Sequence, residues 1–126
     1  MIPKRVLIID DDQEILAVSE LTLRAVGGWQ VLTATSGDEG LVKAEAEQPD
    51  AILLDVMMPD RDGISTFHAL QANPITQPIP VILMTAKAQA REQQKFATLG
   101  VAAIIVKPFK AMKLPAQIAE ILGWDT

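Results

Sequence analysis

Carboxylates directly follow two of the most apolar runs in this chain. The acidic run Asp10–Asp12 comes after Val6–Ile9, and Asp55 comes after Ala51–Leu54, within the stretch ILLDVMMPDRDG. Removing a carboxylate from water is unfavourable unless another group pairs with it. The position of Asp55 at the rim of an apolar run therefore indicates either a local cap or a chemical role.

Two further polar residues follow apolar runs in the same way. Thr85 comes after Val81–Met84, and Lys107 comes after Val101–Val106. In an open α/β sheet, ligands bind outside the carboxyl ends of the strands. If the runs are parallel strands, these side chains and the aspartates gather where the carboxyl ends of the strands meet, which we call the rim of the sheet.

The chemistry of that set is coherent. Asp10, Asp11 and Asp55 repel one another when they are ionised and close, and a hard divalent cation such as Mg²⁺ relieves that repulsion. Lys107 can pair with a carboxylate or a phosphoryl group, and Thr85 can donate a hydrogen bond to a phosphoryl oxygen. A carboxylate in this setting can attack a phosphoryl group and form an acyl phosphate. We therefore interpret Asp55 as a phosphorylation site, and Asp12 as the cap of the following helix.

The elements that must position these residues alternate along the chain. The apolar runs are continuous rather than alternating, which is typical of strands covered on both faces. The predicted strands are Val6–Ile9, Val31–Ala34 (led in by Trp29), Ala51–Leu54, Val81–Met84 and Val101–Val106. The predicted helices cover residues 13–26, 36–47, 63–72, 88–99 and 114–122. This order predicts a doubly wound α/β fold with a five-stranded parallel sheet and flanking helices.

Several local signals support these helices. Ile15, Val18, Thr22 and Val26 share one face of the first helix, which predicts that this face is buried. Ser36 followed by Glu39 fits a capping box at the start of the second helix. In the fourth helix, Phe96 and Leu99 are expected to point inward and Gly100 to end the helix. In the last helix, Pro115 lies in the first turn and Gly123 follows the end.

The size and composition of the chain argue against several classes of protein. With 126 residues, the chain has the size of one domain, residues 1–126, and no output domain is expected after it. The net charge is −5, with 16 acidic against 11 basic residues, which argues against direct nucleic-acid binding. The chain has no cysteine and no apolar run long enough for a membrane span. We expect a cytoplasmic domain without membrane contact.

Four motifs together resemble the receiver domain of two-component response regulators over essentially the whole chain. They are LIIDDD (7–12), LLDVMMPDRDG (53–63), VILMTA (81–86) and IIVKPF (104–109). The resemblance implies a (βα)5 fold of the flavodoxin-like, CheY-like kind. It also implies that a histidine kinase or a histidine phosphotransfer protein donates a phosphoryl group in the presence of Mg²⁺.

The resemblance assigns a role to each motif residue. It implies that Asp55 is the phosphoacceptor and that Asp10 and Asp11 form the acidic pair, with Asp11 a direct Mg²⁺ ligand. The backbone carbonyl of Met57 is implied as a further Mg²⁺ ligand. Thr85 is implied as the switch hydroxyl and Lys107 as the cation that pairs with the phosphoryl group.

Four residues near these motif residues have further predicted roles. Pro108 is expected to follow a cis peptide bond. Gly63 is expected to supply backbone freedom where the loop after Asp55 enters the next helix. Met57 and Lys87 flank the site that water must reach, and we predict that they tune the lifetime of the acyl phosphate.

Two positions depart from the usual receiver pattern. Ile104 stands three residues before Lys107, where receivers often have Tyr or Phe as a rotamer switch. The stretch VAA at 101–103 replaces an acidic pair found in receivers that dimerise on transcription factors. A more apolar face formed by the fourth helix, fifth strand and fifth helix is therefore expected to dock a downstream protein.

Other functions remain as alternatives. An Asp-nucleophile phosphatase needs a general acid two residues after the nucleophile, and Met57 occupies that position. The domain is therefore not expected to be an enzyme beyond its own phosphotransfer and autodephosphorylation. A phosphorylation-independent interaction module stays open because of Ile104. The lone His68 is interpreted as an ordinary helical residue, and no Gly-rich phosphate loop follows the first strand.

Overall fold

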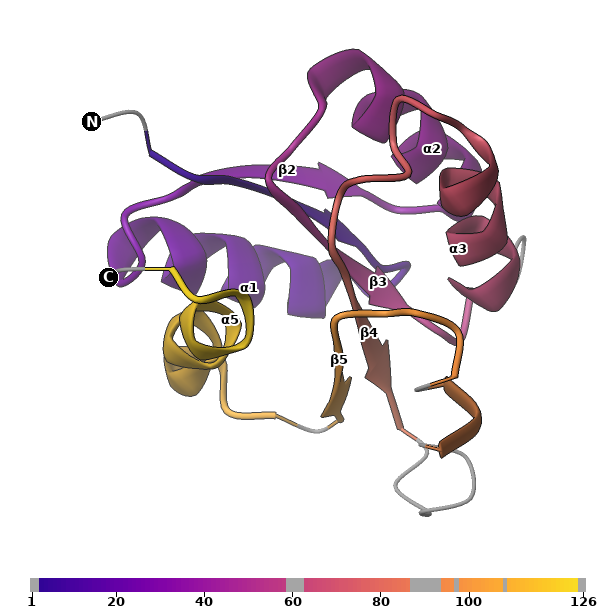
Figure 1. Cartoon of the computed structure of the whole chain (residues 1–126). Coiled ribbons are helices and arrows are strands. Elements are labelled where there is room, and N and C mark those ends of the chain that lie inside the picture. Colours follow the sequence, from indigo (N-terminus) through magenta and orange to yellow (C-terminus); the bar gives the residue numbers. More distant parts are fainter. Residues whose placement is uncertain (1–2, 59–62, 87–93, 97, 108, 125–126) are drawn as a thin grey trace.

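A computed structural model describes residues 3–58, 63–86, 94–96, 98–107 and 109–124. Five parallel strands form one sheet in the order β2-β1-β3-β4-β5 (Figure 1). The strands are β1 (Arg5–Ile9), β2 (Gln30–Ala34), β3 (Ala51–Asp55), β4 (Val81–Thr85) and β5 (Ala103–Val106). The predicted five-stranded parallel sheet is confirmed, and the predicted strand bounds differ from these by two residues at most.

Helices cover both faces of this sheet. They are α1 (Gln13–Ala25), α2 (Gly37–Glu47), α3 (Gly63–Ala72), the short 3₁₀ helix η1 (Ala111–Lys113) and α5 (Leu114–Leu122). Figure 1 shows α1 and α5 on one side of the sheet and α2 and α3 on the other. The doubly wound arrangement predicted from the alternating pattern is therefore confirmed, whereas η1 was not predicted.

Two apolar layers hold the helices on the sheet. On the α1 and α5 side, buried side chains include Val6, Ile8, Leu16, Leu23, Leu53, Leu114 and Ile118. On the α2 and α3 side they include Leu7, Ile9, Ile52, Leu54, Phe67, Leu70 and Phe96. Successive residues of β1 and β3 alternate between the two layers, so these strands are apolar throughout because both faces are covered.

The buried face of α1 differs from the prediction. Leu16, Ser19 and Leu23 are buried, whereas Val18 and Val26 are 51% and 54% exposed. The predicted face is therefore only partly buried: Thr22 is buried and Ile15 is half-buried, whereas the stripe with Leu16 and Leu23 packs against the sheet.

The start of α2 follows the predicted capping pattern with one change. The Ser36 hydroxyl accepts a hydrogen bond from the amide of Glu39 at 3.1 Å. The Glu39 carboxylate accepts from the amide of Thr35 at 2.6 Å rather than from that of Ser36. That hydrogen bond is the main cause that lowers the pKa of Glu39. The cap therefore reaches one residue further back than a standard capping box.

The predicted helix over 88–99 lies largely outside the described residues. Residues 94–96 are helical, Phe96 is buried, and Leu99 packs against the same layer, as expected. Gly100 has φ +92°, the left-handed conformation expected of a residue that ends a helix. Pro108 and Lys87 also lie outside the described residues.

The two tryptophans close the side of the sheet that carries α5. Their ring centroids are 5.1 Å apart in an edge-to-face arrangement, and Trp29 is buried. The ammonium of Lys4 lies 5.2 Å from the centroid of Trp124. Trp124 therefore packs back onto the domain.

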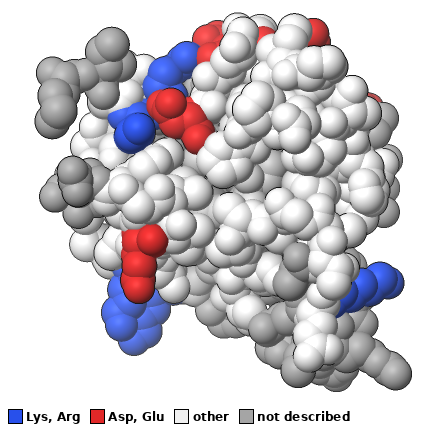
Figure 2. All heavy atoms as spheres, in the orientation of Figure 1, with Lys and Arg blue, Asp and Glu red and all other residues white. Residues whose placement is uncertain are grey.

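Charged side chains are sparse on the face of the molecule seen in Figure 2. The basic and acidic groups visible there lie mostly close to one another, and no continuous basic patch crosses this face. Nucleic-acid binding depends on clustered Lys and Arg side chains. The described residues on this face carry a mixture of basic and acidic groups rather than a basic cluster.

Candidate functional site

The parallel register brings the ends of β1 and β3 side by side. Ile9 pairs with Leu54, so the residues that follow them in the chain, Asp10 and Asp55, are neighbours. Carboxylate oxygens of Asp10, Asp11 and Asp55 lie within 4.8 Å of one another, and we call these three residues the acidic cluster. Asp10 and Asp55 are buried, whereas Asp11 is exposed. The predicted convergence of the three aspartates is confirmed.

Lys107 links two members of the acidic cluster. Its ammonium donates a hydrogen bond to Asp10 Oδ2 at 2.9 Å and lies 3.3 Å from Asp55 Oδ1. Its backbone amide donates to the carbonyl of Thr85 at 2.7 Å, which fixes the start of the chain after β5. The cation is therefore held over the rim by both its main chain and its side chain.

The environment shifts the pKa of both charged partners. Burial of the Asp55 carboxyl and the nearby charge of Asp10 raise its pKa from 3.8 to about 6, although Lys107 acts in the opposite direction. Burial alone would lower the pKa of Lys107, but the hydrogen bond with Asp10 and the charge of Asp55 raise it. The ionised form of Asp55 is therefore destabilised, whereas the protonated, cationic form of Lys107 is stabilised.

The acidic cluster has the donors that a hard divalent cation needs. With all three carboxylates ionised, the ammonium of Lys107 offsets one of their three negative charges among the described residues. Carboxylate oxygens are ligands that Mg²⁺ prefers, and Mg²⁺ retains several waters when few protein ligands are present. The residues present therefore fit Mg²⁺ at this rim.

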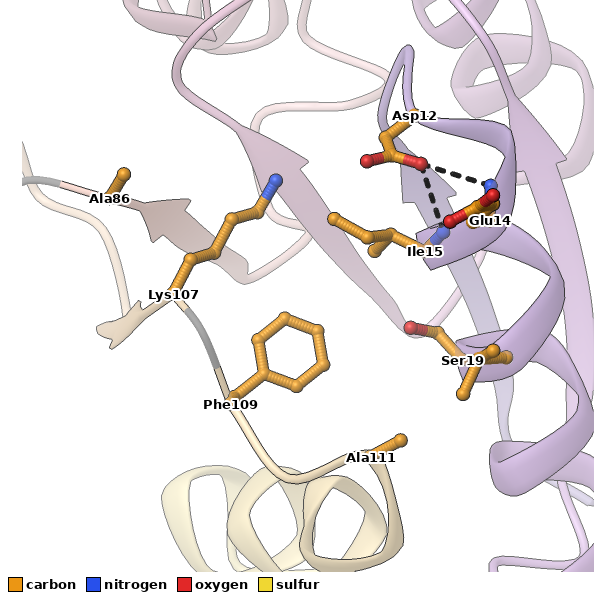
Figure 3. A pocket seen from close by; sticks show the side chains of 9 residues that line it. Asp12, Glu14, Ile15, Ser19, Ala86, Lys107, Phe109 and Ala111 are labelled. Atoms are coloured by element: carbon orange, nitrogen blue, oxygen red, sulfur yellow. Dashed lines mark hydrogen bonds between the residues drawn. The ribbon is translucent and has the colours of Figure 1, made fainter.

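Hydrogen bonds around Asp10 and Asp12 orient the start of α1. The amide of Asp12 donates to Asp10 Oδ1 at 2.9 Å. The Asp12 carboxylate in turn accepts from the amides of Glu14 and Ile15 at 3.0 and 3.2 Å, as drawn in Figure 3. The prediction that Asp12 caps this helix is confirmed, which separates its role from that of the acidic cluster.

The two remaining predicted site residues lie at the same rim. Thr85 is the last residue of β4, is fully buried, and pairs in register with Val106 of β5. The amide of Met57 donates to Asp55 Oδ1 at 3.2 Å, and its side chain is 58% exposed. Met58, in contrast, is buried in the apolar layer on the α2 and α3 side.

Gly63 was expected to supply backbone freedom, but the structure indicates a different role. Positive φ angles among the described glycines occur at Gly28, Gly100 and Gly123, and not at Gly63. An ideal Cβ at Gly63 would instead lie 2.3 Å from the carbonyl oxygen of Asp55. This position excludes a side chain because of close backbone packing, and it does not need glycine for conformational freedom.

A pocket of about 430 Å³ opens beside the site, between α1 and the segment after β5. We call it the α1 pocket. Its lining residues are Asp12, Glu14, Ile15, Val18, Ser19, Ala86, Lys107, Phe109 and Ala111. In Figure 3, the Phe109 ring lies between Lys107 and Ala111, and the Ser19 hydroxyl points toward the pocket. Neither Phe109 nor Ser19 was predicted as a site residue, although Phe109 lies in the IIVKPF motif.

Known proteins share this fold. The family model of the response regulator receiver domain matches residues 6–119. The alkaline phosphatase synthesis transcriptional regulatory protein PhoP of Bacillus subtilis is 34% identical over 119 residues, covering 94% of this chain and 48% of PhoP. Chemotaxis response regulator CheY4 of Vibrio cholerae superposes with a TM-score of 0.87 at 28% identity, covering 94% of this chain and 98% of CheY4.

A third similar structure contains a metal ion. The receiver domain of sensor histidine kinase PA1611 from Pseudomonas aeruginosa superposes with a TM-score of 0.84 at 27% identity, covering 96% of this chain and 98% of that one. That structure has a magnesium ion coordinated in its active-site cleft. Receiver domains bind Mg²⁺ at an acidic site, and the acidic cluster is the corresponding kind of site here.

This chain belongs to the response regulator receiver domain family and is a receiver of two-component signalling. Receivers of this family interact with histidine kinases and with downstream targets. The chain spans about half the length of the curated relatives it matches. None of the helices in the described part of the chain is long and apolar enough to cross a bilayer.

Proposed function

We propose that this receiver accepts a phosphoryl group on Asp55 with Mg²⁺ bound at the acidic cluster, and that the acyl phosphate changes how the domain docks to another protein. The observation that supports this most strongly is the position of the Lys107 ammonium, 2.9 Å from Asp10 and 3.3 Å from Asp55. A buried nucleophilic carboxylate, an adjacent acidic residue and a fixed cation form a complete set for phosphoryl transfer.

The transfer step uses the ionised carboxylate of Asp55. One carboxylate oxygen forms a bond to phosphorus while the bond from phosphorus to the imidazole nitrogen of the phosphodonor breaks. The imidazole leaves with that electron pair and takes up a proton. With its pKa near 6, Asp55 is mostly ionised at pH 7 and available as the nucleophile.

Asp10, Asp11 and Asp55 would hold Mg²⁺, with the backbone carbonyl of Met57 as a further ligand. When bound, the ion neutralises charge on the phosphoryl oxygens. Lys107 stays beside Asp55 and pairs with a phosphoryl oxygen once the acyl phosphate has formed. The Thr85 hydroxyl donates to another phosphoryl oxygen, which couples the end of β4 to the state of Asp55.

We propose that the domain is not an enzyme acting on a separate substrate. Met57 stands two residues after Asp55, where an Asp-nucleophile phosphatase has its general acid, and a thioether cannot protonate a leaving group. The chemistry therefore consists of transfer to Asp55 and slow hydrolysis of the product.

The phosphodonor protein would approach over the α1 pocket. Val18, which lines the pocket together with Lys107, is 51% exposed. Two further exposed apolar side chains, Leu21 (68%) and Met112 (69%), belong to α1 and η1, the elements that also carry the pocket residues Val18 and Ala111. Exposed apolar groups beside a polar site are typical of an interaction surface. Val18→Glu is expected to slow transfer from a cognate histidine kinase, while uptake from acetyl phosphate, which needs no docking, stays unchanged.

The downstream protein would dock along β5 and α5, the part of the predicted docking face that the structure describes. A hollow of about 550 Å³ runs there, lined by Ile104, Ile105, Val106, Phe109, Lys110, Lys113, Gln117, Glu120 and Ile121. Because β5 is at the edge of the sheet and Phe109 lines both this hollow and the α1 pocket, movement of the segment after Lys107 can reach both surfaces.

Intact-mass spectrometry tests this function. The protein is incubated with acetyl phosphate and Mg²⁺, with a metal-free sample and the Asp55→Asn variant as controls. We expect a gain of one phosphoryl mass only in the wild type with Mg²⁺. No gain in a folded wild type that binds Mg²⁺ would contradict the proposal and favour a phosphorylation-independent interaction module.

A further inference from the structure

Gly63, the first residue of α3, packs directly on the backbone of the phosphorylation site. An ideal Cβ on Gly63 would lie 2.3 Å from the carbonyl oxygen of Asp55, 2.9 Å from its carbonyl carbon, and 2.6 Å from the Cα of Val56. Favourable contacts between heavy atoms begin at about 3.5 Å. Because all three atoms belong to the main chain, rotation of a side chain cannot relieve the overlap.

The backbone that Gly63 touches is held by hydrogen bonds on several sides. The amide of Gly63 donates to the carbonyl of Val56 at 2.9 Å, and the amide of Val56 donates to the carbonyl of Met84 at 2.9 Å. The amide of Met57 donates to Asp55 Oδ1 at 3.2 Å. Residues 55–57 are therefore fixed between β4 on one side and the first turn of α3 on the other.

We propose that Gly63 is a positioning residue for the acidic cluster. The missing side chain lets the first turn of α3 press on the peptide between Asp55 and Val56, and this contact holds both the Asp55 carboxylate and the Met57 backbone at the rim. The inference rests on the proposed function, because it takes Asp55 and the Met57 carbonyl as Mg²⁺ ligands.

A side chain at position 63 would have to move either α3 or the Asp55 carbonyl. Either movement shifts the Asp55 carboxylate relative to Asp10 and Asp11. Mg²⁺ requires near-ideal octahedral geometry, so small displacements of its ligands weaken binding. Loss of a group that supports metal ligands typically reduces metal affinity by roughly 10–100-fold.

Backbone freedom does not explain glycine at this position. Since Gly63 does not have a positive φ, alanine can adopt its backbone conformation. Where a Cβ also has room, a change from glycine to alanine usually stabilises a protein, because it restricts the unfolded chain. A loss of Mg²⁺ affinity in Gly63→Ala would therefore come from the steric contact with Asp55 and Val56.

Gly27→Ala provides a matched control at the far end of the fold. Its Cβ would lie 2.7 Å from the carbonyl oxygen of Leu23, so this variant also introduces a backbone overlap, but in the turn before β2. Both variants and the wild type are titrated with MgCl₂ by isothermal calorimetry. The titrations are run in sucrose, which favours the folded state, and circular dichroism checks folding in each sample.

We expect Gly63→Ala to bind Mg²⁺ roughly tenfold or more weakly than the wild type, and Gly27→Ala to bind it normally. Equal affinity in folded Gly63→Ala would overturn the inference, and so would a Gly63→Ala protein that stays unfolded in sucrose, because Gly63 would then serve folding alone. A wild type that binds no Mg²⁺ would instead contradict the proposed function, so the two failures are distinguishable.

Discussion

The ammonium of Lys107 donates a hydrogen bond to the buried carboxylate of Asp10 at 2.9 Å, although the two residues are 97 positions apart in the chain. The same ammonium lies 3.3 Å from Asp55, so one cation is shared by two carboxylates that follow neighbouring strands. This sharing partly offsets the repulsion between Asp10 and Asp55 in the metal-free protein. In the proposed function, it also places Lys107 beside the Mg²⁺ ligands and the phosphoacceptor.

Replacing Lys107 separates its structural role from its chemical one. In Lys107→Met, two buried carboxylates lose their counter-ion, so we expect the metal-free protein to lose roughly 3 kcal/mol in free energy of unfolding. Mg²⁺ is expected to bind at least as tightly, because a competing positive charge is gone, while phosphoryl uptake falls. Urea unfolding with and without Mg²⁺ measures this. The control is Lys110→Met, which replaces an exposed neighbouring lysine. Equal stability of the two variants would count against a stabilising interaction of Lys107 with Asp10 and Asp55.

The raised pKa of Asp55 predicts a pH dependence of stability. Because folding raises this pKa from 3.8 to about 6, the folded state favours the protonated carboxyl. That stabilisation is fully present below about pH 4 and is lost as the pH rises through about 6. In metal-free buffer, the free energy of unfolding of the wild type should fall relative to that of Asp55→Asn over this range, by roughly 3 kcal/mol at most. A constant difference between the two proteins across pH 4–7 would show that the pKa is not raised.

Residues at strand ends were the easiest part of the site to predict. The carboxyl ends of parallel strands meet at one edge, so the residue type that follows each apolar run indicated the site before any contact was known. Asp10, Asp55 and Lys107 were placed correctly for this reason. The acidic cluster therefore follows from chain order and strand direction alone.

Features that depend on tertiary contacts were not predictable in the same way. The helix α1 has two apolar stripes, one with Leu16 and Leu23 and one with Val18, and helical periodicity does not show which of them faces the sheet. Gly63 gives no local signal of its close approach to Asp55, since that contact exists only after α3 packs on β3. Such roles require the packed structure.

The buried face of α1 contains a polar atom that offers a simple stability test. Among the described residues, the Ser19 hydroxyl is the buried side-chain oxygen without a hydrogen-bond partner. Removing an unsatisfied buried hydroxyl should be favourable, so Ser19→Ala is expected to raise the free energy of unfolding by about 1 kcal/mol. Ser36→Ala removes a serine that caps α2 and should lower it by about 1 kcal/mol. Destabilisation by both substitutions would indicate that Ser19 has a partner in solution.

Met57 is expected to control water access to the acyl phosphate. Its side chain is 58% exposed next to Asp55, and Lys87 follows Thr85 by two residues in the chain. Replacing both with alanine should speed hydrolysis of the acyl phosphate, because water reaches phosphorus more easily. The decay of the phosphorylated species is followed by mass spectrometry after the donor is removed. Met112→Ala, at another exposed methionine, serves as the control, and an unchanged rate in the double variant would refute the role.

The central claim is that Asp55 is the residue that receives the phosphoryl group, and chemical mapping tests it most directly. The protein is treated with acetyl phosphate and Mg²⁺, the acyl phosphate is reduced with borohydride, and the digested peptides are sequenced by mass spectrometry. Reduction converts a phosphorylated aspartate to homoserine, so we expect homoserine at position 55 only in samples that contained Mg²⁺. Homoserine at position 10 or 11, or unmodified aspartate at all three positions in a folded protein that binds Mg²⁺, would contradict the assignment of Asp55.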